Sequence, residues 1–484
     1  MGLLNRAVIS IKWASISQVG RQFIQYIATL ILVSLLAPNE FGLMATALII
    51  VNFLELFKDL GTSSAIIQRI SISDSLLSSV FWLNVSFGLL IFAIIFFSSP
   101  VLADFFNNNK LILILKVLPV VFIISSLSNV QRALLEKELH FNLISKIELG
   151  STIFGALIGV FLAFKGFGVW SLVYQTISNL SLATILFFIC SKWKPSVSFN
   201  IKEIKSISSF SINLVGFNFF NFFARNADYL IIAKFLGEVQ LGHYYLIYRI
   251  MLYPIQNISQ VISRVVFPVY SKIQHDNVKL SKAFKDVTSS IAIFTFPLML
   301  GLIAISNLFI HSFFGSKWDY NLLVSLLIVL APVGLMQSLT SNVGSLYLSK
   351  ARTDLFLKWG ILSSIVYVVG FLIGIKWGAW GVALSYLITN IILFYPVFAI
   401  PFKLINLNFL TFIKNLNGTI LSALIMACIV FLSGIYISKF LENTISLIIV
   451  CLIGVISYFL ISLKINRNKI LFIFSMLKMN KILS

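Results

Sequence analysis

Residues 76–98 read LLSSVFWLNVSFGLLIFAIIFFS and contain no charged side chain. A helix needs about 20 predominantly apolar residues to cross a lipid bilayer. This stretch is therefore predicted to form a membrane-spanning helix. It also sets the pattern for the rest of the chain, where runs of similar length and character recur from one end to the other.

The overall composition agrees with that pattern. Of the 484 residues, 59% are hydrophobic and only 11% are charged, whereas a soluble domain is about 45–50% apolar and about 25% charged. So few charged side chains cannot cover the surface of a water-soluble protein of this length. The composition excludes a soluble enzyme and a disordered or fibrous protein, and it predicts an all-α integral membrane protein.

Fourteen apolar runs are long enough to span a membrane. Turn signals such as Pro38-Asn39 and residues 107–109 (NNN) separate them. The expected spans lie at about 13–36, 41–60, 76–98, 110–129, 146–165, 167–190, 207–236, 241–263, 288–313, 321–347, 355–375, 377–401, 415–438 and 444–463.

The basic residues predict the orientation of these spans. The chain holds 36 Lys and Arg against 16 Asp and Glu, a formal net charge of +20. Counted over the segments between the expected spans, Lys and Arg fall mostly on the side that holds both termini. By the positive-inside rule, we expect both termini to be cytoplasmic. The basic charge then needs no nucleic-acid partner.

An internal repeat relates the two halves of the chain. Residues 30–42 (LILVSLLAPNEFG) match 230–242 (LIIAKFLGEVQLG) at an offset of 200. Further along, residues 128–130 and 341–343 both read SNV, and Gly168 and Trp170 correspond to Gly378 and Trp380. Six expected spans separate the copies, an even number, so the two copies have the same orientation.

The repeat predicts three parts of the chain. Two parallel six-helix lobes would occupy 1–200 and 201–405, and a C-terminal helix pair with a basic cytoplasmic tail would occupy 406–484. Such a pair of lobes is typical of a transporter that works by alternating access around a central cavity.

Polar side chains within the expected spans are candidates for lining that cavity, because ionisable groups at membrane depth are costly and usually functional. Arg21 and Gln25 lie on one face of the first span, and Asn221 and Arg225 on one face of the seventh. Arg249 lies in the eighth. Guanidinium groups bind phosphate oxygens with two parallel hydrogen bonds, so these faces favour an anionic substrate.

Acidic residues in the spans are candidates for ion coupling or gating. They are Glu55, Asp59, Glu148 and Asp228. Each has an alternative interpretation: Glu55 and Asp59 lie near a helix end that water can reach, Glu148 could pair with a basic residue, and Asp228 could neutralise Arg225. H⁺ and Na⁺ are the candidate coupling ions.

The sequence contains no constellation that indicates catalysis. It has no GxxxxGK[ST] motif for nucleotide hydrolysis, no cluster of carboxylates with His, and three scattered cysteines, Cys190, Cys428 and Cys451. We therefore expect no enzyme activity, no metal site and no cofactor.

Several stretches resemble the polysaccharide-transporter branch of the multidrug/oligosaccharidyl-lipid/polysaccharide flippase superfamily, above all its Wzx-type and colanic-acid exporter-like members. The stretches are 36–43 (LAPNEFGL), 57–61 (FKDLG), 65–68 (AIIQ), 135–141 (LEKELHF) and 225–228 (RNAD). The layout of twelve spans plus two also resembles that branch.

The resemblance implies the function. Such proteins move undecaprenyl-diphosphate-linked oligosaccharides, for O-antigen, capsule or exopolysaccharide, from the inner to the outer leaflet of the bacterial cytoplasmic membrane. It also implies the bilayer and a polysaccharide polymerase as partners. Three alternatives stay open: a cation-coupled drug antiporter of the same superfamily, a lipid II flippase, and a non-transporting component of a membrane synthase.

Overall fold

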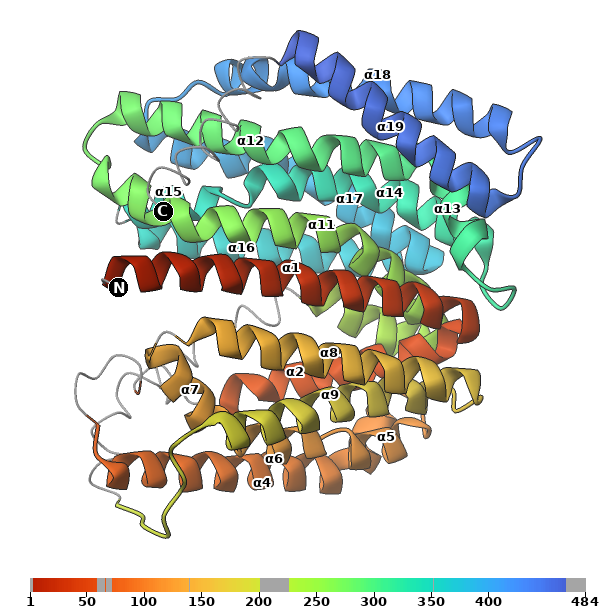
Figure 1. Ribbon diagram of the computed structural model, residues 1–484. Coiled ribbons are helices and arrows are strands. Elements are labelled where there is room, and N and C mark those ends of the chain that lie inside the picture. Colours follow the sequence, from red (N-terminus) through yellow and green to blue (C-terminus); the bar gives the residue numbers. More distant parts are fainter. Residues whose placement is uncertain are drawn as a thin grey trace. The chain divides into compact units, whose positions relative to one another are not determined.

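The computed structural model describes residues 3–58, 66, 72–138, 140–200, 226–350 and 352–466 (Figure 1). Within these ranges every regular element is a helix. Eight of the described helices are long and apolar enough to cross a membrane, and a bent pair, Leu111–Ser126 with Asn129–Lys137, would make a ninth. Helices suit a lipid environment because they satisfy their backbone hydrogen bonds internally. The all-helical prediction is confirmed at this level.

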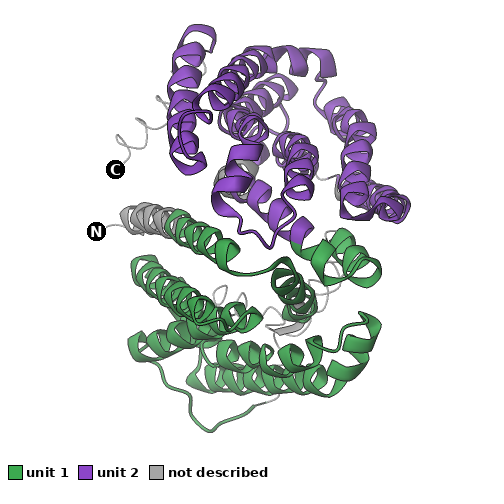
Figure 2. Cartoon of the chain, turned by 90° about the vertical axis from the view of Figure 1, so that its right-hand side faces the viewer, with its two compact units in different colours: residues 1–242 green, residues 243–484 purple. Residues whose placement is uncertain are grey.

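The chain divides into two compact units, residues 1–242 and 243–484 (Figure 2). This division falls inside a helix, α11, whereas the lobes expected from the repeat meet at residue 200. The lobe boundaries at 200 and 405 therefore stay a prediction. Unit 1 holds α1 (Leu3–Leu35), α2 (Pro38–Lys58), α4 (Asp74–Phe105), α5 (Leu111–Val117), α6 (Val120–Ser126), α7 (Asn129–Lys137), α8 (Phe141–Phe164), α9 (Val169–Cys190) and the first residues of α11 (Gly237–Lys272).

In unit 1, α8 packs against both α1 and α9, and α4 packs against α5 and α6. The buried face of α8 carries mainly small residues, which let neighbouring helices approach closely in membranes. They include Ser145, Ser151, Gly155, Ala156 and Gly159. This close packing brings the polar faces of α1, α8 and α9 together.

The span expected at 110–129 is formed by two short helices in sequence, α5 and α6, rather than by one continuous helix. Pro119 separates α5 from α6, because proline donates no backbone hydrogen bond and its ring clashes with the preceding turn. A second break follows at residues 127–128, where the chain bends by 42° into α7. The hydroxyls of Ser125 and Ser126 donate to carbonyls three residues back, at 3.3 and 2.7 Å. Such bonds compete with the helical ladder and bend helices.

Unit 2 contains the rest of α11 and the remaining helices. They are α12 (Asn277–Ala304), α13 (Ser306–Phe313), α14 (Tyr320–Thr340), α15 (Val343–Ser349), α16 (Thr353–Gly374), the 3₁₀ turn η1 (Ile375–Trp377), α17 (Gly378–Leu404), α18 (Phe409–Ile437) and α19 (Asn443–Ile465). Here α12 packs against α14 and α18, and α14 and α16 pack against α17. The C-terminal pair α18 and α19 pack on each other.

Matched stretches of the repeat have the same local structure. The break between α6 and α7 at residues 127–128 corresponds to the break between α14 and α15 at Ser341-Asn342. Gly168 and Gly378 both have a positive φ, 57° and 72°, at the start of α9 and α17. Only glycine adopts such a backbone conformation without steric strain, so the same turn recurs where the sequence predicts it.

The glycines at the offset of 200 meet directly. A Cβ added to Gly42 would overlap the carbonyl oxygen of Glu238, and a Cβ added to Gly242 would overlap the carbonyl oxygen of Pro38. Positions 38 and 238 differ by the same 200 residues as positions 42 and 242. The contact between α2 and α11 is therefore reciprocal, as at a two-fold symmetric interface.

The segment between the expected spans 241–263 and 288–313 is more regular than a loop. Residues 264–287 are mostly helical, because α11 continues to Lys272 and α12 already begins at Asn277. The Asp276 side chain caps α12 by accepting from the backbone N–H of Lys279 at 3.0 Å, and this bond holds the pKa of Asp276 below its usual value. Such caps satisfy the first N–H groups of a helix.

Candidate functional site

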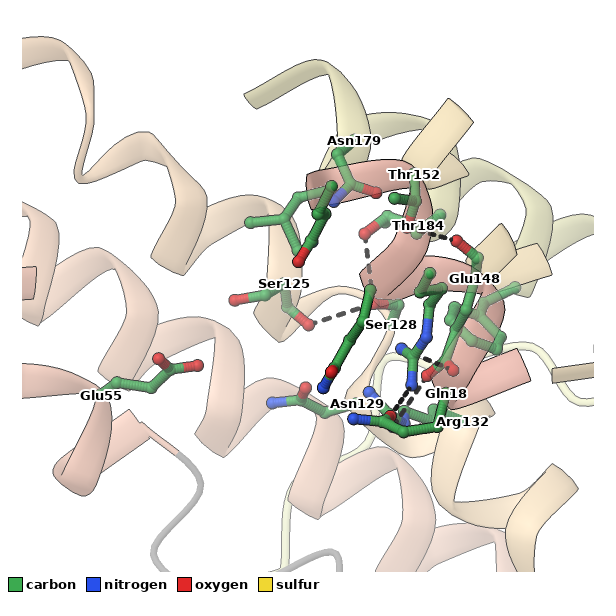
Figure 3. Close-up of a pocket in the computed structure, with 16 residues that line it drawn as sticks. Gln18, Glu55, Ser125, Ser128, Asn129, Arg132, Glu148, Thr152, Asn179 and Thr184 are labelled. Carbon is green, nitrogen blue, oxygen red and sulfur yellow. Dashed lines mark hydrogen bonds and ion pairs between the residues drawn. The ribbon is translucent and has the colours of Figure 1, made fainter. Parts of the chain in front are cut away.

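Unit 1 encloses a polar cavity of about 340 Å³. Its wall is formed by side chains from α1, α2, α6, α7, α8 and α9 and from the bend before α7 (Figure 3). The lining residues are Gln18, Arg21, Gln22, Gln25, Glu55, Ser125, Ser128, Asn129, Arg132, Glu148, Thr152, Asn179, Leu180, Ala183, Thr184 and Phe187. Three of them are apolar, which is unusual for the interior of a helical membrane protein.

Arg21 lies near the middle of α1 and is held from two sides. One of its terminal nitrogens, Nη1, lies 2.7 Å from Oε2 of Glu148. The other, Nη2, donates to Oε1 of Gln18 on the preceding turn of α1 at 2.5 Å. The side chain is 27% exposed, so the guanidinium is partly desolvated and fixed in direction.

Arg132 reaches the same carboxylate from α7. Its Nη2 lies 2.9 Å from Oε1 of Glu148, and its Nε donates to Oε1 of Glu136 at 2.9 Å. The bend between α6 and α7 gives Arg132 this direction, since α7 begins at Asn129 on the cavity wall. In Figure 3, Gln18, Arg132 and Glu148 lie together at one end of the cavity, and Glu55 lies apart from them.

Glu148 bridges the two arginines with one carboxylate oxygen for each. It lies in the first part of α8, and its side chain is only 12% exposed. An ionised carboxylate that is this buried needs charged partners. The arginines supply them, and the carboxylate between them offsets the repulsion between the two guanidinium groups.

Several polar atoms of the cavity wall have no hydrogen-bond partner within the described part of the chain. They include two donors, Nε of Arg21 and Nδ2 of Asn129, and two acceptors, Oε1 of Gln22 and Oε1 of Glu148. The contact of that Glu148 oxygen with Arg132 is therefore an ion pair without hydrogen-bond geometry. Buried polar atoms are nearly always hydrogen-bonded in folded proteins. Unused donors beside two guanidinium groups indicate a site that can bind an anion with several oxygen atoms.

The remaining wall is neutral and polar. Ser128 Oγ lies 3.1 Å from Thr184 Oγ1, and Thr184 donates to the carbonyl of Ile124 at 3.1 Å. These bonds tie α9 to the bend before α7 and keep the far wall in place. Among the residues that the structure describes, no group of three His, Cys, Asp or Glu side chains could hold a metal ion.

Unit 2 contains a second, smaller cavity of about 240 Å³. Its lining carries aromatic and aliphatic side chains with a few neutral polar groups, and no charged residue lines it. The lining residues are Met336, Thr340, Val343, Gly344, Phe356, Trp359, Ser363, Tyr367, Asn390, Leu393, Phe394 and Val397. Tyr367 donates to Oδ1 of Asn390 at 3.2 Å, which pairs two of the polar side chains with each other.

The structure places some of the predicted residues in the unit 1 cavity. Arg21, Gln25, Glu55 and Glu148 all line it. For Glu148, the interpretation as partner of a basic residue is the one that the geometry matches. Its basic partners include Arg21, which lies far from Glu148 in the sequence.

Other predicted residues lie elsewhere. Arg249 belongs to unit 2, where it donates to the hydroxyl of Tyr245 at 3.1 Å and lies over the rings of Tyr245 and Tyr253. Asp228 is buried and accepts from the backbone N–H of Tyr229 at 2.9 Å. Asp59, Asn221 and Arg225 lie outside the described residues, so their place at a cavity stays a prediction.

Sequence reasoning missed Arg132 as a cavity residue. The expected span ended at residue 129, which assigned Arg132 to a cytoplasmic loop. One signal could have corrected this. Ser128-Asn129-Val130 repeats as Ser341-Asn342-Val343, and a break that recurs inside two apolar runs of the same chain indicates a bend rather than a loop.

Comparison with known proteins supports the same family as the sequence motifs. A family model described as "Polysaccharide biosynthesis protein" matches residues 31–322, which is more than half of the chain. The chain belongs to the polysaccharide biosynthesis protein family.

Relatives in this family cover most of the chain. The teichuronic acid biosynthesis protein TuaB of Bacillus subtilis is 31% identical over 375 residues, 76% of each protein. The lipopolysaccharide biosynthesis protein WzxC of Escherichia coli is 30% identical over 81% of this chain and 80% of its own. The succinoglycan biosynthesis transport protein ExoT of Rhizobium meliloti is 26% identical over 64% of this chain and 63% of its own.

Solved structures show the fold of the family. The lipid II flippase MurJ in its inward closed conformation matches with a TM-score of 0.74, covering 94% of this chain and 99% of its own at 21% identity. An inward-facing multidrug transporter of the MATE family matches with a TM-score of 0.62, covering 80% of this chain and 94% of its own at 16% identity. The chain thus has the same fold as these two proteins.

Proposed function

We propose that this protein moves undecaprenyl-diphosphate-linked oligosaccharides from the cytoplasmic to the outer leaflet of the bacterial cytoplasmic membrane. The observation that carries the proposal is the cavity of unit 1, where Arg21 and Arg132 converge from two helices beside unused donors. A diphosphate is the charged part of such a substrate. The names of the relatives WzxC, TuaB and ExoT support a role in polysaccharide biosynthesis.

The physical need for such a cavity follows from the substrate. Transfer of an ionised group from water into hydrocarbon costs on the order of tens of kcal/mol. A polar cavity with two guanidinium groups replaces the lost hydration, while the polyprenyl chain stays in the bilayer. The neutral polar wall, with Asn179, Thr152 and Ser128, offers hydrogen bonds that sugar hydroxyls can use.

The finer arrangement completes the proposal. Fourteen spans would form two parallel six-helix lobes and a C-terminal pair, with both termini in the cytoplasm. The substrate head would enter from the cytoplasmic side and leave from the other side as the lobes alternate. The protein would act as a transporter without catalysis, and a polysaccharide polymerase would use the exported repeat units.

The energy source is part of the proposal. No nucleotide-binding motif occurs in the chain, so an ion gradient, the membrane potential or consumption of the product would drive the cycle. Glu55, Asp59, Glu148 and Asp228 are the candidate groups for H⁺ or Na⁺ coupling. Changing each to its amide without loss of pH-dependent transport would remove that residue from the set.

Deletion of the gene tests the function. We expect the surface glycan to disappear and its undecaprenyl-linked precursor to accumulate in the inner leaflet, and the wild-type gene to restore both. An unchanged glycan with increased sensitivity to cationic drugs would instead indicate the antiporter of the same superfamily. Loss of cell-wall synthesis with accumulation of lipid II would indicate the lipid II flippase.

A further inference from the structure

We propose that the carboxylate of Glu148 occupies the position that the diphosphate of the substrate takes. In each transport cycle, Glu148 and the substrate would then bind in turn to the same two arginines. The inference rests on the proposed function and assigns to one residue the role of an internal competing anion.

The geometry of Glu148 is that of an oxyanion bridging two guanidinium groups. One oxygen lies 2.7 Å from Nη1 of Arg21, and the other lies 2.9 Å from Nη2 of Arg132. Carboxylate and phosphate groups accept from arginine in the same way, through oxygens that match its fork of N–H donors. A diphosphate oxygen can therefore take each of these two places.

The charges around Glu148 explain why exchange is needed. Within the described part of the chain, four other charged side chains share its cavity or pair with an arginine that it contacts. They are Arg21 from α1, Glu55 from α2, and Arg132 and Glu136 from α7. The part of α9 that lines the cavity, including Asn179 and Thr184, carries no charge.

Together these five side chains carry two positive and three negative charges. An entering diphosphate adds at least one further negative charge, and like charges at close range repel strongly when partly buried. The diphosphate can bind both arginines only when Glu148 leaves them. The cluster is thus poised for replacement of one anion by another.

The surroundings leave room for the exchange. The backbone of Glu148 is held within α8, where its carbonyl accepts from Thr152 Oγ1 at 2.7 Å, and only the side chain needs to rotate. The unused Nε of Arg21 and Nδ2 of Asn129 line the same cavity. They can donate to the additional oxygens that a diphosphate has and a carboxylate lacks.

Exchange also serves release. A site that held the diphosphate with two free arginines would bind it tightly and retain it after the lobes have changed their orientation. A carboxylate that returns to the arginines competes with the bound diphosphate and speeds its departure. The same competition lowers the affinity of the site for the diphosphate when the substrate enters.

The amide variant Glu148→Gln tests the proposal, because it keeps the shape of the side chain and removes the competing charge. Purified protein in detergent is titrated with undecaprenyl diphosphate, and undecaprenol serves as the ligand without phosphate. We expect the affinity of Glu148→Gln for undecaprenyl diphosphate to rise about tenfold, while export in cells falls. An affinity equal to or below that of the wild type would overturn the proposal.

Two further variants complete the design. Glu138→Gln is the matched control, since it also removes a carboxylate near the end of α7, but one that pairs with His140 and is 62% exposed rather than one that contacts either arginine, and its affinity should stay within about twofold of the wild type. Glu148→Asp keeps the charge but is too short to bridge both arginines, so its affinity should lie between those of the wild type and Glu148→Gln. If Glu148→Gln does not fold, Glu148→Asp decides, and an affinity no higher than that of the wild type contradicts the exchange.

The same titration separates this proposal from the proposed function. If wild-type protein binds undecaprenyl diphosphate no better than undecaprenol, the function itself fails. If the wild type prefers the diphosphate and neither Glu148 variant gains affinity, only the exchange fails.

Discussion

The two cavities stand at corresponding places of the repeat and differ in chemistry. In α9, positions 180, 183, 184 and 187 line the first cavity, and in α17 positions 390, 393, 394 and 397 line the second. Each pair differs by 210 residues, the offset that relates Gly168 to Gly378. Thr184 in the first cavity becomes Phe394 in the second, and Ala183 becomes Leu393.

The difference shows which features a duplicated fold retains. Both units keep the helix breaks, the glycine turns and the hollow between the helices, because these depend on backbone geometry. Among the described residues, charged side chains line the cavity of unit 1 and do not line the cavity of unit 2. We infer that recognition of the anionic head is a property of unit 1, and that unit 2 supplies a lining of aromatic side chains without such a role.

The largest effect is expected from replacing Arg132, whose counterpart in the repeat is not an arginine. Arg132 corresponds to Ser345, since Ser128 corresponds to Ser341. Arg132→Ala should reduce glycan export at least tenfold, because a charged hydrogen bond contributes about 1.5–3 kcal/mol, while Ser345→Ala should leave export nearly unchanged. Arg132→Lys should restore only part of it, because lysine lacks the planar fork.

Export is measured as surface glycan per amount of membrane-inserted protein in the deletion strain. Equal losses in Arg132→Ala and Ser345→Ala would show that the two cavities contribute alike.

Exchange of one residue pair between the cavities should have the next largest effect. Thr184→Phe places the side chain of unit 2 into the cavity of unit 1, and should lower export about tenfold by filling the space beside Ser128. The reverse change, Phe394→Thr, removes a ring that lies 5.3 Å from that of Phe398. It should cost about 2 kcal/mol of stability with export per folded molecule within about twofold.

Thermal unfolding in detergent and surface glycan are measured for both variants. Loss of export in folded Phe394→Thr protein would contradict the different roles assigned to the two cavities.

The reciprocal glycine contact gives a test of the repeat itself. Gly42→Ala and Gly242→Ala each place a Cβ against a backbone carbonyl of the other helix, which cannot move aside as a side chain can. Each should lower stability by about 1–3 kcal/mol, and the two losses should be similar. Gly150→Ala is the control, because a Cβ there meets nothing within 4 Å.

The three melting temperatures decide this prediction. A large loss for one of the two glycines and none for the other would contradict a symmetric crossing.

The smallest effect is expected from the serines at the two breaks. Ser128 contacts Thr184 of α9 within the cavity wall at 3.1 Å. Among the described residues, the hydroxyl of Ser341 instead donates to the carbonyl of Ser338 in its own segment at 2.8 Å. Ser128→Ala should cost about 1 kcal/mol, and Ser341→Ala should cost less. The free energy of unfolding of both variants is measured in the same detergent. A larger loss for Ser341→Ala than for Ser128→Ala would contradict the prediction.

Much of the architecture could be predicted from local sequence. The apolar runs predict helices because lipid leaves the backbone no other partner, and the matched glycines predict the matched turns. The interruption by Pro119 and Ser125–Ser128 was harder to predict, since hydrophobicity alone continues through it. Its consequence, the placement of Arg132, was missed for the same reason.

The site depended on contacts that no local pattern contains. Arg21 could be singled out because it is an ionisable residue in an apolar span. Its partner Glu148 lies on α8, more than a hundred residues later, and only the packing of α8 between α1 and α9 brings the two within 2.7 Å. Sequence could therefore identify the charged residues one by one, but not the bridge between them.

The most direct test of the account is a binding measurement on the unit 1 cavity. Purified wild-type protein and the double variant Arg21→Gln with Arg132→Gln are titrated with undecaprenyl diphosphate and with undecaprenol. We predict that the wild type prefers the diphosphate and that the double variant loses this preference, with an affinity at least about 100-fold weaker. Equal affinity of both proteins for undecaprenyl diphosphate would contradict the account, because the diphosphate would then bind elsewhere.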